Sequence, residues 1–356
     1  MLMHPASDAA PLPLRPFRAL RCLVLLVVCA AALALVGGAG VLHAAATPAG
    51  RIAYVAPDGS LVVANADGSA PQPIWTAPRG ETVREPRWSP DSTRLAFIGP
   101  DGNVWTVGAD GSAPHPLTQQ AVAPSGCGDD GCTNPGAAAD TPRWSPDGTL
   151  ISYRLVQGLA TAAIFTVPAA GGSPTRLVSA PDLCLFNEGF TPGGVALYSR
   201  CAAASGPSNA TYLAADGASR PFLAGSQIAY SLDGTMIAFS SQATSGNAIQ
   251  VTLFIAQADG SEARTVAADG QNPAWSAQGL LAYQVGGTDG WSVHVFDPTD
   301  GSDRVVAQGQ FGCWSADGGW LVYTVTDAEG ATLWSVRADG TQAHPLAAGE
   351  APACTS

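Results

Sequence analysis

Short apolar runs alternate with turn residues along residues 51–356, in a pattern that repeats about every 40 residues. Six of the runs, among them RLAFI, LISYRL and WLVYTV, directly follow a segment that begins with an aromatic residue and Ser or Thr and ends in Gly or Ser. The aromatic residues lie 39 to 56 positions apart and are Trp88, Trp144, Phe190, Tyr230, Trp275 and Trp314. Apolar runs of this length between turn residues predict buried β-strands.

A second motif, a tight turn containing Asp-Gly or Gly-Gly, recurs seven times between shorter apolar runs. Such a turn predicts a hairpin, because glycine adopts a positive φ without steric cost. The seven copies are Asp67-Gly68, Asp110-Gly111, Gly171-Gly172, Asp216-Gly217, Asp259-Gly260, Asp300-Gly301 and Asp339-Gly340. The aspartates of both turn motifs are expected to cap their turns, with calcium binding as the alternative.

Each repeat therefore predicts four short strands. One strand ends at the aromatic residue, one follows the first turn, one precedes the Asp-Gly turn and one follows it. Four strands per unit at a period of about 40 residues are typical of a propeller blade. The seven hairpin turns predict an all-β protein with a single β-propeller of seven four-stranded blades over residues 47–356.

The repeats resemble the TolB-type, WD40-like propeller repeats of bacterial exported proteins over roughly residues 51–356. The segments that carry the resemblance are of the types Trp144–Gly148 and Ala109–Gly111. TolB itself carries an α/β domain ahead of its propeller, and no such domain separates the N-terminal segment of this sequence from its first blade. The resemblance therefore implies the propeller and does not extend to a TolB role in envelope integrity.

The two ends of the repeat region predict how the ring closes. The first unit, residues 50–75, has an Asp-Gly turn but no aromatic strand before it. Residues 351–356 match that missing strand, with Cys354 in the aromatic position 40 residues after Trp314. We expect this C-terminal segment to supply the innermost strand of the first blade, because closure removes exposed sheet edges.

The N-terminal residues 1–46 form a separate segment. Arg15, Arg18 and Arg21 precede a wholly apolar run over residues 22–36, and small residues follow up to Ala46. This arrangement is typical of a signal peptide that is cleaved after Ala46. The alternative is an uncleaved membrane anchor over residues 22–42, since that uncharged run is long enough to span a bilayer. In both cases residues 47–356 are expected outside the cytoplasm, in the periplasm, at the cell surface or in the medium.

The charge of the exported part narrows the possible partners. All 16 basic residues are arginine, and the full chain has a formal net charge of −12. Removal of residues 1–46 takes away three arginines and one aspartate, Asp8, which changes this charge to −14. An acidic surface argues against nucleic acid and against anionic membrane surfaces as partners.

Six cysteines lie outside the N-terminal segment, and an exported protein is expected to pair them as disulfides. Antiparallel pairing across the turn between Phe190 and Val195 places Cys184 opposite Cys201. Cys127 and Cys132 are expected to close a small loop, with a metal site as the alternative for this pair. Cys313 and Cys354 lie on innermost strands of neighbouring blades once the ring closes, although they differ by one position relative to the aromatic slot.

Strand order predicts two different faces. Both turn motifs lie at one end of the blades, the turn face. The opposite end, the loop face, gathers the connections between blades and the loops between second and third strands, which vary in length and include 99–103, 155–163, 201–210, 240–249, 284–291, 325–331 and the insertion 121–140. Variable loops on a rigid frame are favoured places for binding. This face is expected to be acidic, through Asp129, Asp130, Asp140, Asp182, Asp289, Asp327 and Glu329.

Arg87 and Arg143 occupy the same position of the repeated segment PRWSPD in adjacent blades. They are candidates for binding at the mouth of the channel, and the alternative is that they pair with neighbouring carboxylates. No nucleophile elbow, cofactor motif or metal-ligand set is recognisable, so we expect no enzyme activity and no cofactor.

Three functions are compatible with this sequence. The first is a monomeric, non-catalytic scaffold that binds an unidentified protein or peptide on the loop face. The second is a receptor or enzyme, of lyase or lactonase type, for a small molecule or carbohydrate at the channel mouth. The third is a purely structural surface module.

Overall fold

The computed structural model describes residues 47–355, except 79, 123–124, 129–130, 135, 159–160, 182–183, 202–208, 216, 246–247 and 288–289. The predicted signal or anchor in residues 1–46 lies outside these residues. In the part of the chain that is described, no helix is long and apolar enough to cross a membrane. The unit Thr47–Ser356 contains the repeats.

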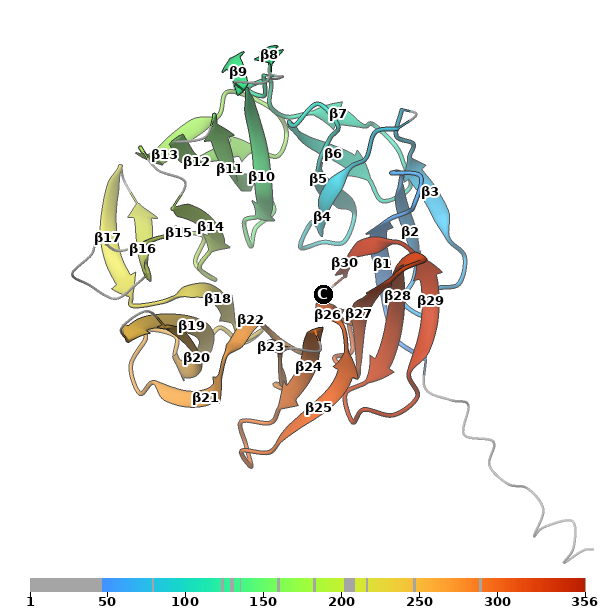
Figure 1. The fold of residues 1–356 in the computed structure, drawn as a ribbon, viewed down its shortest axis with the longest axis vertical. Coiled ribbons are helices and arrows are strands. Elements are labelled where there is room, and N and C mark those ends of the chain that lie inside the picture. The colour runs from blue at the N-terminus through green and yellow to red at the C-terminus, as the bar shows by residue number, and fades with distance from the viewer. Residues whose placement is uncertain are drawn as a thin grey trace, which may run out of the picture. The chain divides into compact units, whose positions relative to one another are not determined.

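Seven sheets, each of four antiparallel strands, surround a common axis (Figure 1). The innermost strands are β30 (Glu350–Cys354), β4 (Arg84–Trp88), β10 (Ala137–Trp144), β14 (Leu185–Phe190), β18 (Ser226–Tyr230), β22 (Gly270–Trp275) and β26 (Gln310–Trp314). They belong to blades 1 to 7 in this order. The predicted seven-bladed all-β propeller is therefore confirmed.

The remaining strands of each blade follow outward in sequence order. The second strands are β1 (Arg51–Val55), β5 (Arg94–Ile98), β11 (Leu150–Gln157), β15 (Ala196–Cys201), β19 (Met236–Ser245), β23 (Leu281–Gly287) and β27 (Trp320–Asp327). The third strands are β2 (Leu61–Asn65), β6 (Val104–Gly108), β12 (Thr161–Pro168), β16 (Asn209–Ala215), β20 (Ala248–Gln257), β24 (Gly290–Phe296) and β28 (Gly330–Arg337).

The outer strands are β3 (Gln72–Trp75), β7 (His115–Pro116), β13 (Thr175–Ala180), β17 (Ala218–Leu223), β21 (Arg264–Ala268), β25 (Asp303–Gln308) and β29 (His344–Ala348). A separate two-stranded hairpin is formed by β8 (Ser125–Gly128) and β9 (Gly131–Asn134), which in chain order follow the last strand of blade 2 and precede the first strand of blade 3.

The apolar runs form second strands that are covered on both faces. In β5, four consecutive side chains from Leu95 to Ile98 are fully buried. Leu95 and Phe97 pack into the cluster shared with blade 1, whereas Ala96 and Ile98 pack into the cluster shared with blade 3. Because both faces are buried, these strands are continuously apolar rather than alternating, and the core consists of layers between the blades.

The aromatic slot, meaning the position of Trp88 and its equivalents, joins four of the blades to the one before them by a hydrogen bond. The indole nitrogen of Trp88 donates a hydrogen bond to the carbonyl oxygen of Ala353 in blade 1, at 3.0 Å. Trp144, Trp275 and Trp314 make the equivalent bond to Arg87, Ala229 and Ala274 at 2.9 to 3.1 Å. Each acceptor directly precedes the slot residue of the preceding blade.

Ring closure follows the prediction. Strand β30 pairs antiparallel with β1, with Ile52 opposite Cys354 and Ala53 opposite Ala353. Figure 1 shows β30 beside β1, on the side that faces the centre of the ring. The C-terminal segment is therefore the innermost strand of blade 1.

The turn aspartates described by the structure cap their turns, as expected. In the first turn of blade 2 the Ser89 hydroxyl donates to Asp91 at 2.6 Å and the Thr93 amide donates at 3.1 Å. These bonds stabilise the carboxylate and lower the pKa of Asp91 to about 2. In the second turn of this blade the Ser112 amide donates to Asp110 at 2.9 Å, and hydrogen bonds from Ser112 likewise lower the pKa of Asp110.

Two of the three expected cysteine pairs are bonded in the structure. Cys184 and Cys201 form a disulfide with their Cα atoms 5.3 Å apart, and Cys313 and Cys354 form one with their Cα atoms 5.7 Å apart. The backbone of Cys127 faces that of Cys132 across the β8–β9 ladder. The side chains of this third pair lie outside the described residues, so its disulfide stays a prediction.

Candidate functional site

The two predicted faces are distinct. On the turn face, the two turns of one blade are joined by a backbone hydrogen bond, for example from the amide of Ala109 to the carbonyl of Thr93 at 2.8 Å. Blades 3 and 7 repeat this bond between Ala169 and Thr149 and between Ala338 and Gly319. The turn face is therefore a regular, bonded scaffold. The variable loops lie at the opposite ends of the strands.

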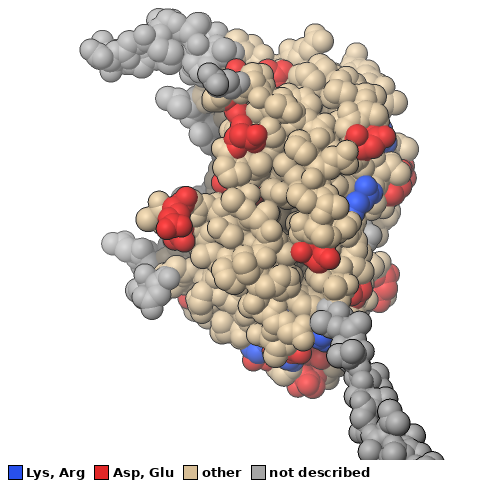
Figure 2. Space-filling view, turned by 90° about the vertical axis from the view of Figure 1, so that its right-hand side faces the viewer, with Lys and Arg blue, Asp and Glu red and all other residues tan. Residues whose placement is uncertain are grey.

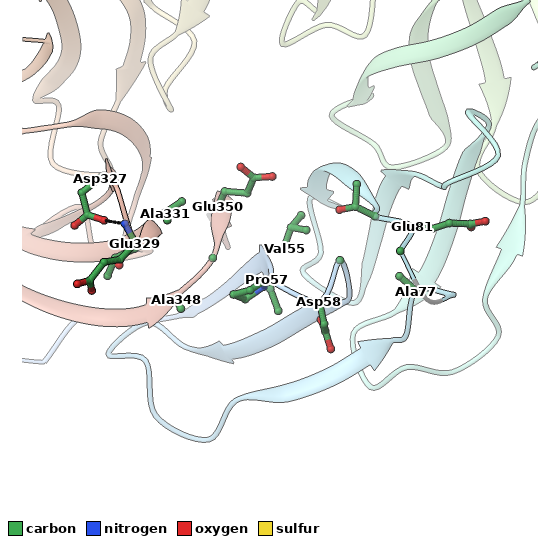
Figure 3. A pocket seen from close by; sticks show the side chains of 17 residues that line it. Val55, Pro57, Asp58, Ala77, Glu81, Asp327, Glu329, Ala331, Ala348 and Glu350 are labelled. Atoms are coloured by element: carbon green, nitrogen blue, oxygen red, sulfur yellow. Dashed lines mark hydrogen bonds between the residues drawn. The ribbon is translucent and has the colours of Figure 1, made fainter. Parts of the chain in front are cut away.

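A cavity of about 940 Å³ lies on the loop face beside the ring closure, and we call it the closure pocket (Figure 3). Its walls come from four stretches of chain that are remote in sequence. They are the β1–β2 loop at 56–59, residues 77 and 80–82 of the connection between blades 1 and 2, the β27–β28 turn at 327–330, and residues 348–350 at the start of β30. Ring closure thus assembles this pocket.

Five carboxylates line the closure pocket, and all five are exposed. They are Asp58, Glu81, Asp327, Glu329 and Glu350. Among the described lining residues there is no arginine or histidine. Figure 3 shows the carboxylates spread along the pocket, with Asp327 and Glu329 at one end and Glu81 at the other. In the described part of the chain no three His, Cys, Asp or Glu side chains gather as a metal site.

The lining between the carboxylates is apolar and small. Val55 is buried beneath the pocket, and Pro57, Ala77, Ala331 and Ala348 contribute to its walls. Two of the acids also hold their loops. Asp58 accepts the Ser60 amide at 3.0 Å, and Asp327 accepts the Glu329 amide at 2.8 Å. An apolar surface with spaced negative charges suits an extended ligand that carries cationic groups.

Of the acidic loop residues predicted from the sequence, Asp327 and Glu329 line this pocket. Asp140 is instead paired with Arg154, at 2.6 Å. Asp129, Asp130, Asp182 and Asp289 lie outside the described residues. The remaining lining acids, Asp58, Glu81 and Glu350, are missed by sequence reasoning. Asp58 follows the second strand of blade 1, so assigning the C-terminal strand to that blade marks 56–60 as one more loop of this face.

Arg87 and Arg143 line a second cavity of about 580 Å³ on the propeller axis, and we call it the channel cavity. Its walls come from the innermost strands of blades 2 to 7. Cys201 and Asn209, which border the β15–β16 connection, place this cavity toward the loop face.

The two arginines form no ion pair with a described carboxylate. Burial and the neighbouring charge of Arg143 lower the pKa of Arg87 to about 9, and burial also lowers the pKa of Arg143. Glu85 and Glu188 are close enough to oppose these shifts in part. Neighbouring carboxylates thus act on both arginines without a direct ion pair between described residues, and the role of Arg87 and Arg143 in binding at the channel mouth stays a prediction.

Glu85 and Glu188 accept hydrogen bonds from the next blade in the channel wall instead of binding the arginines. Glu85 accepts the backbone amide of Thr141 in the next blade at 2.8 Å. Glu188 accepts the amide of Ile228 at 3.1 Å and the Ser199 hydroxyl at 2.6 Å. Both carboxylates thus bind neighbouring innermost strands together.

Comparison with known proteins is informative about the fold. The sequence matches no protein-family model and no curated protein. TolB from Acinetobacter baumannii has a similar structure, with a TM-score of 0.51 and 16% identity over 86% of this chain. This chain spans 66% of the length of that TolB.

Two further propellers are similar in fold. An oligogalacturonate lyase in complex with manganese gives a TM-score of 0.60 at 11% identity, covering 78% of this chain and 82% of that one. The β-propeller domain of the Trilobed protease from Pyrococcus furiosus gives 0.55 at 12% identity, covering 81% and 86%. The TolB-type propeller is thus confirmed as a fold, and the low identities transfer no function.

Proposed function

We propose that this chain is an exported, non-catalytic propeller that binds a protein or peptide on its loop face, and that the closure pocket is the binding site. The observation that carries this proposal is the pocket itself, with its five exposed carboxylates and apolar lining. A partner segment with arginine or lysine side chains would place its charges against the carboxylates and its aliphatic stems on the apolar walls.

The disulfides support export. Bonds of the Cys184–Cys201 and Cys313–Cys354 type persist in oxidising compartments and are rare in the cytosol. The N-terminal segment supports the same conclusion, through its arginines and its apolar run. The periplasm or the cell surface is therefore the proposed location.

Peptide binding tests the proposal directly. Labelled ten-residue peptides with two or three arginines at varied spacing are compared with the same peptides in which glutamine replaces arginine. At low salt we expect the three-arginine peptides to bind about tenfold more tightly than their glutamine controls and the two-arginine peptides about fivefold, since each contact contributes about 0.5 kcal/mol.

Charge-removing variants locate the binding. The triple variant D327N/E329Q/E350Q removes three of the five lining carboxylates and is expected to remove most of the preference for arginine, while the matched turn-face variant D110N/D259N keeps it. Asparagine at position 327 can still accept the Glu329 amide, so the loop is retained. Equal affinity for arginine and glutamine peptides, or an unchanged preference in the triple variant, would reject the closure pocket as the site.

A further inference from the structure

The channel cavity contains two guanidinium groups with unused hydrogen-bonding capacity. A guanidinium has five N–H donors. Among the described residues, Arg87 makes one hydrogen bond, to the carbonyl of Pro86 at 3.0 Å, and Arg143 makes one, to the carbonyl of Pro142 at 3.4 Å. Both acceptors belong to the adjacent residue of the same strand. The outer edges of both groups are thus available to a ligand.

The nearby acids do not fill this role. Glu85 and Glu188 are held by the backbone amides of Thr141 and Ile228, which belong to neighbouring blades. These bonds fix both carboxylates in the channel wall, and no ion pair between described residues joins either one to Arg87 or Arg143. An external anion can bind the arginines without breaking the links between blades.

A second observation in the same cavity also points to a ligand. Asn209 is 6% exposed and lines the cavity, and its side-chain oxygen has no hydrogen-bond partner among the described residues. Its amide nitrogen donates to the Ser226 hydroxyl at 2.6 Å. If the amide is rotated by 180°, the nitrogen is left unpaired instead, so either orientation leaves one buried polar atom unmet.

The lining also offers an apolar surface. Phe186 is 44% exposed, which is unusual for phenylalanine, and it lines the cavity together with Ile228 and Phe311. A volume of about 580 Å³ is within the range of small-molecule sites.

We propose that the channel cavity binds a small organic acid, with its carboxylate held between Arg87 and Arg143 and its body against Phe186. A planar guanidinium matches the two oxygens of a carboxylate, which makes paired arginines well suited to this group. The lowered pKa of Arg87 still leaves it charged at pH 7, and a bound carboxylate would raise that pKa. The site is independent of the closure pocket, since the two cavities have no lining residue in common.

The test compares acids with their neutral amides on the full protein by isothermal titration calorimetry. The probes are mandelate with mandelamide, glucuronate with glucuronamide, and the peptide Ala-Ala-Phe with a free or an amidated C-terminus. We expect at least one small acid to bind about tenfold or more tightly than its amide. If only the free peptide terminus shows this preference, the carboxylate comes from a peptide and the small-acid proposal is overturned.

Variants assign the preference to the arginines. R87Q and R143Q are expected to lose the acid-over-amide preference, R87K to retain part of it, and R220Q, which removes an exposed arginine of β17, to retain it fully. The closure-pocket variant D327N/E329Q/E350Q is expected to bind the acids normally, which separates this site from the peptide site.

The wild-type comparison does not depend on any variant folding. Three results would each overturn the proposal: equal binding of acids and amides, no binding of any probe, or displacement of the bound acid by chloride at the same concentration.

Discussion

At the residue scale, the aromatic slot does more than fill space. The sequence predicts burial of the slot aromatics between blades, which holds for Trp88, Trp275 and Trp314 at no more than 9% exposed, whereas Trp144, Phe190 and Tyr230 are only half-buried. It does not predict the indole hydrogen bonds, because their acceptors are backbone carbonyls of another blade, whose positions depend on how the blades pack. The bond of Trp88 to Ala353 is an example, since it joins residues 265 positions apart in sequence.

Replacing Trp88 by phenylalanine tests this bond. A smaller aromatic ring remains, but the buried carbonyl of Ala353 loses its indole donor, so loss of this bond alone should lower the free energy of unfolding by about 1–3 kcal/mol. Trp105 is the matched control, because its indole donates to Asp101 at an exposed site. Denaturant unfolding of W88F and W105F provides the comparison, and equal destabilisation would speak against a role for the blade-to-blade bond.

At the level of strands, the contact between blade 7 and blade 1, which closes the ring, has a disulfide where other pairs of blades have the tryptophan hydrogen bond. Blade 1 has Cys354 in the aromatic slot, and Cys313 directly precedes the slot residue of blade 7. At four other contacts between blades, a tryptophan hydrogen bond joins these same two positions. The offset of one position, which from the sequence alone casts doubt on the Cys313–Cys354 pair, is therefore the register that neighbouring blades adopt.

The innermost strands also contain a feature that sequence reasoning misses. The residue three positions before the slot has a positive φ in five blades, at Glu85, Thr141, Gln227, Asn272 and Ala351. These residues share no chemistry, and none is glycine, so no sequence signal marks the irregularity. At Thr141 and Asn272 the backbone amide donates to the side chain of the equivalent residue in the preceding blade, Glu85 at 2.8 Å and Gln227 at 3.0 Å.

Removal of the two disulfides tests the closure. By loop entropy, C313S/C354S and C184S/C201S should each cost about 3–4 kcal/mol of unfolding free energy. Hydrogen exchange distinguishes the two variants, because only C313S/C354S removes the disulfide that holds β30, the strand that closes the ring. The β30 amides should exchange faster in C313S/C354S and remain protected in C184S/C201S. Unchanged protection of β30 in the first variant would show that strand pairing alone holds the ring shut.

At the scale of the whole molecule, repetition made the fold predictable and the site only partly so. Seven similar turns and six similar strands are enough to infer the blades and their closure. The closure pocket instead combines single acids from four remote stretches, and only Asp327 and Glu329 stand out in the sequence. The acidic character of the protein surface is nevertheless predictable from the net charge of the sequence. Figure 2 shows more acidic than basic side chains on the side in view.

Hydrogen–deuterium exchange of the protein with and without a bound arginine peptide tests the central claim most directly. The account predicts slower exchange around residues 56–59, 80–82, 327–331 and 348–350, which surround the closure pocket. It predicts no change in the Asp-Gly turns of the turn face. Protection confined to the turn face, or no protection at the closure pocket while the peptide is bound, would contradict it.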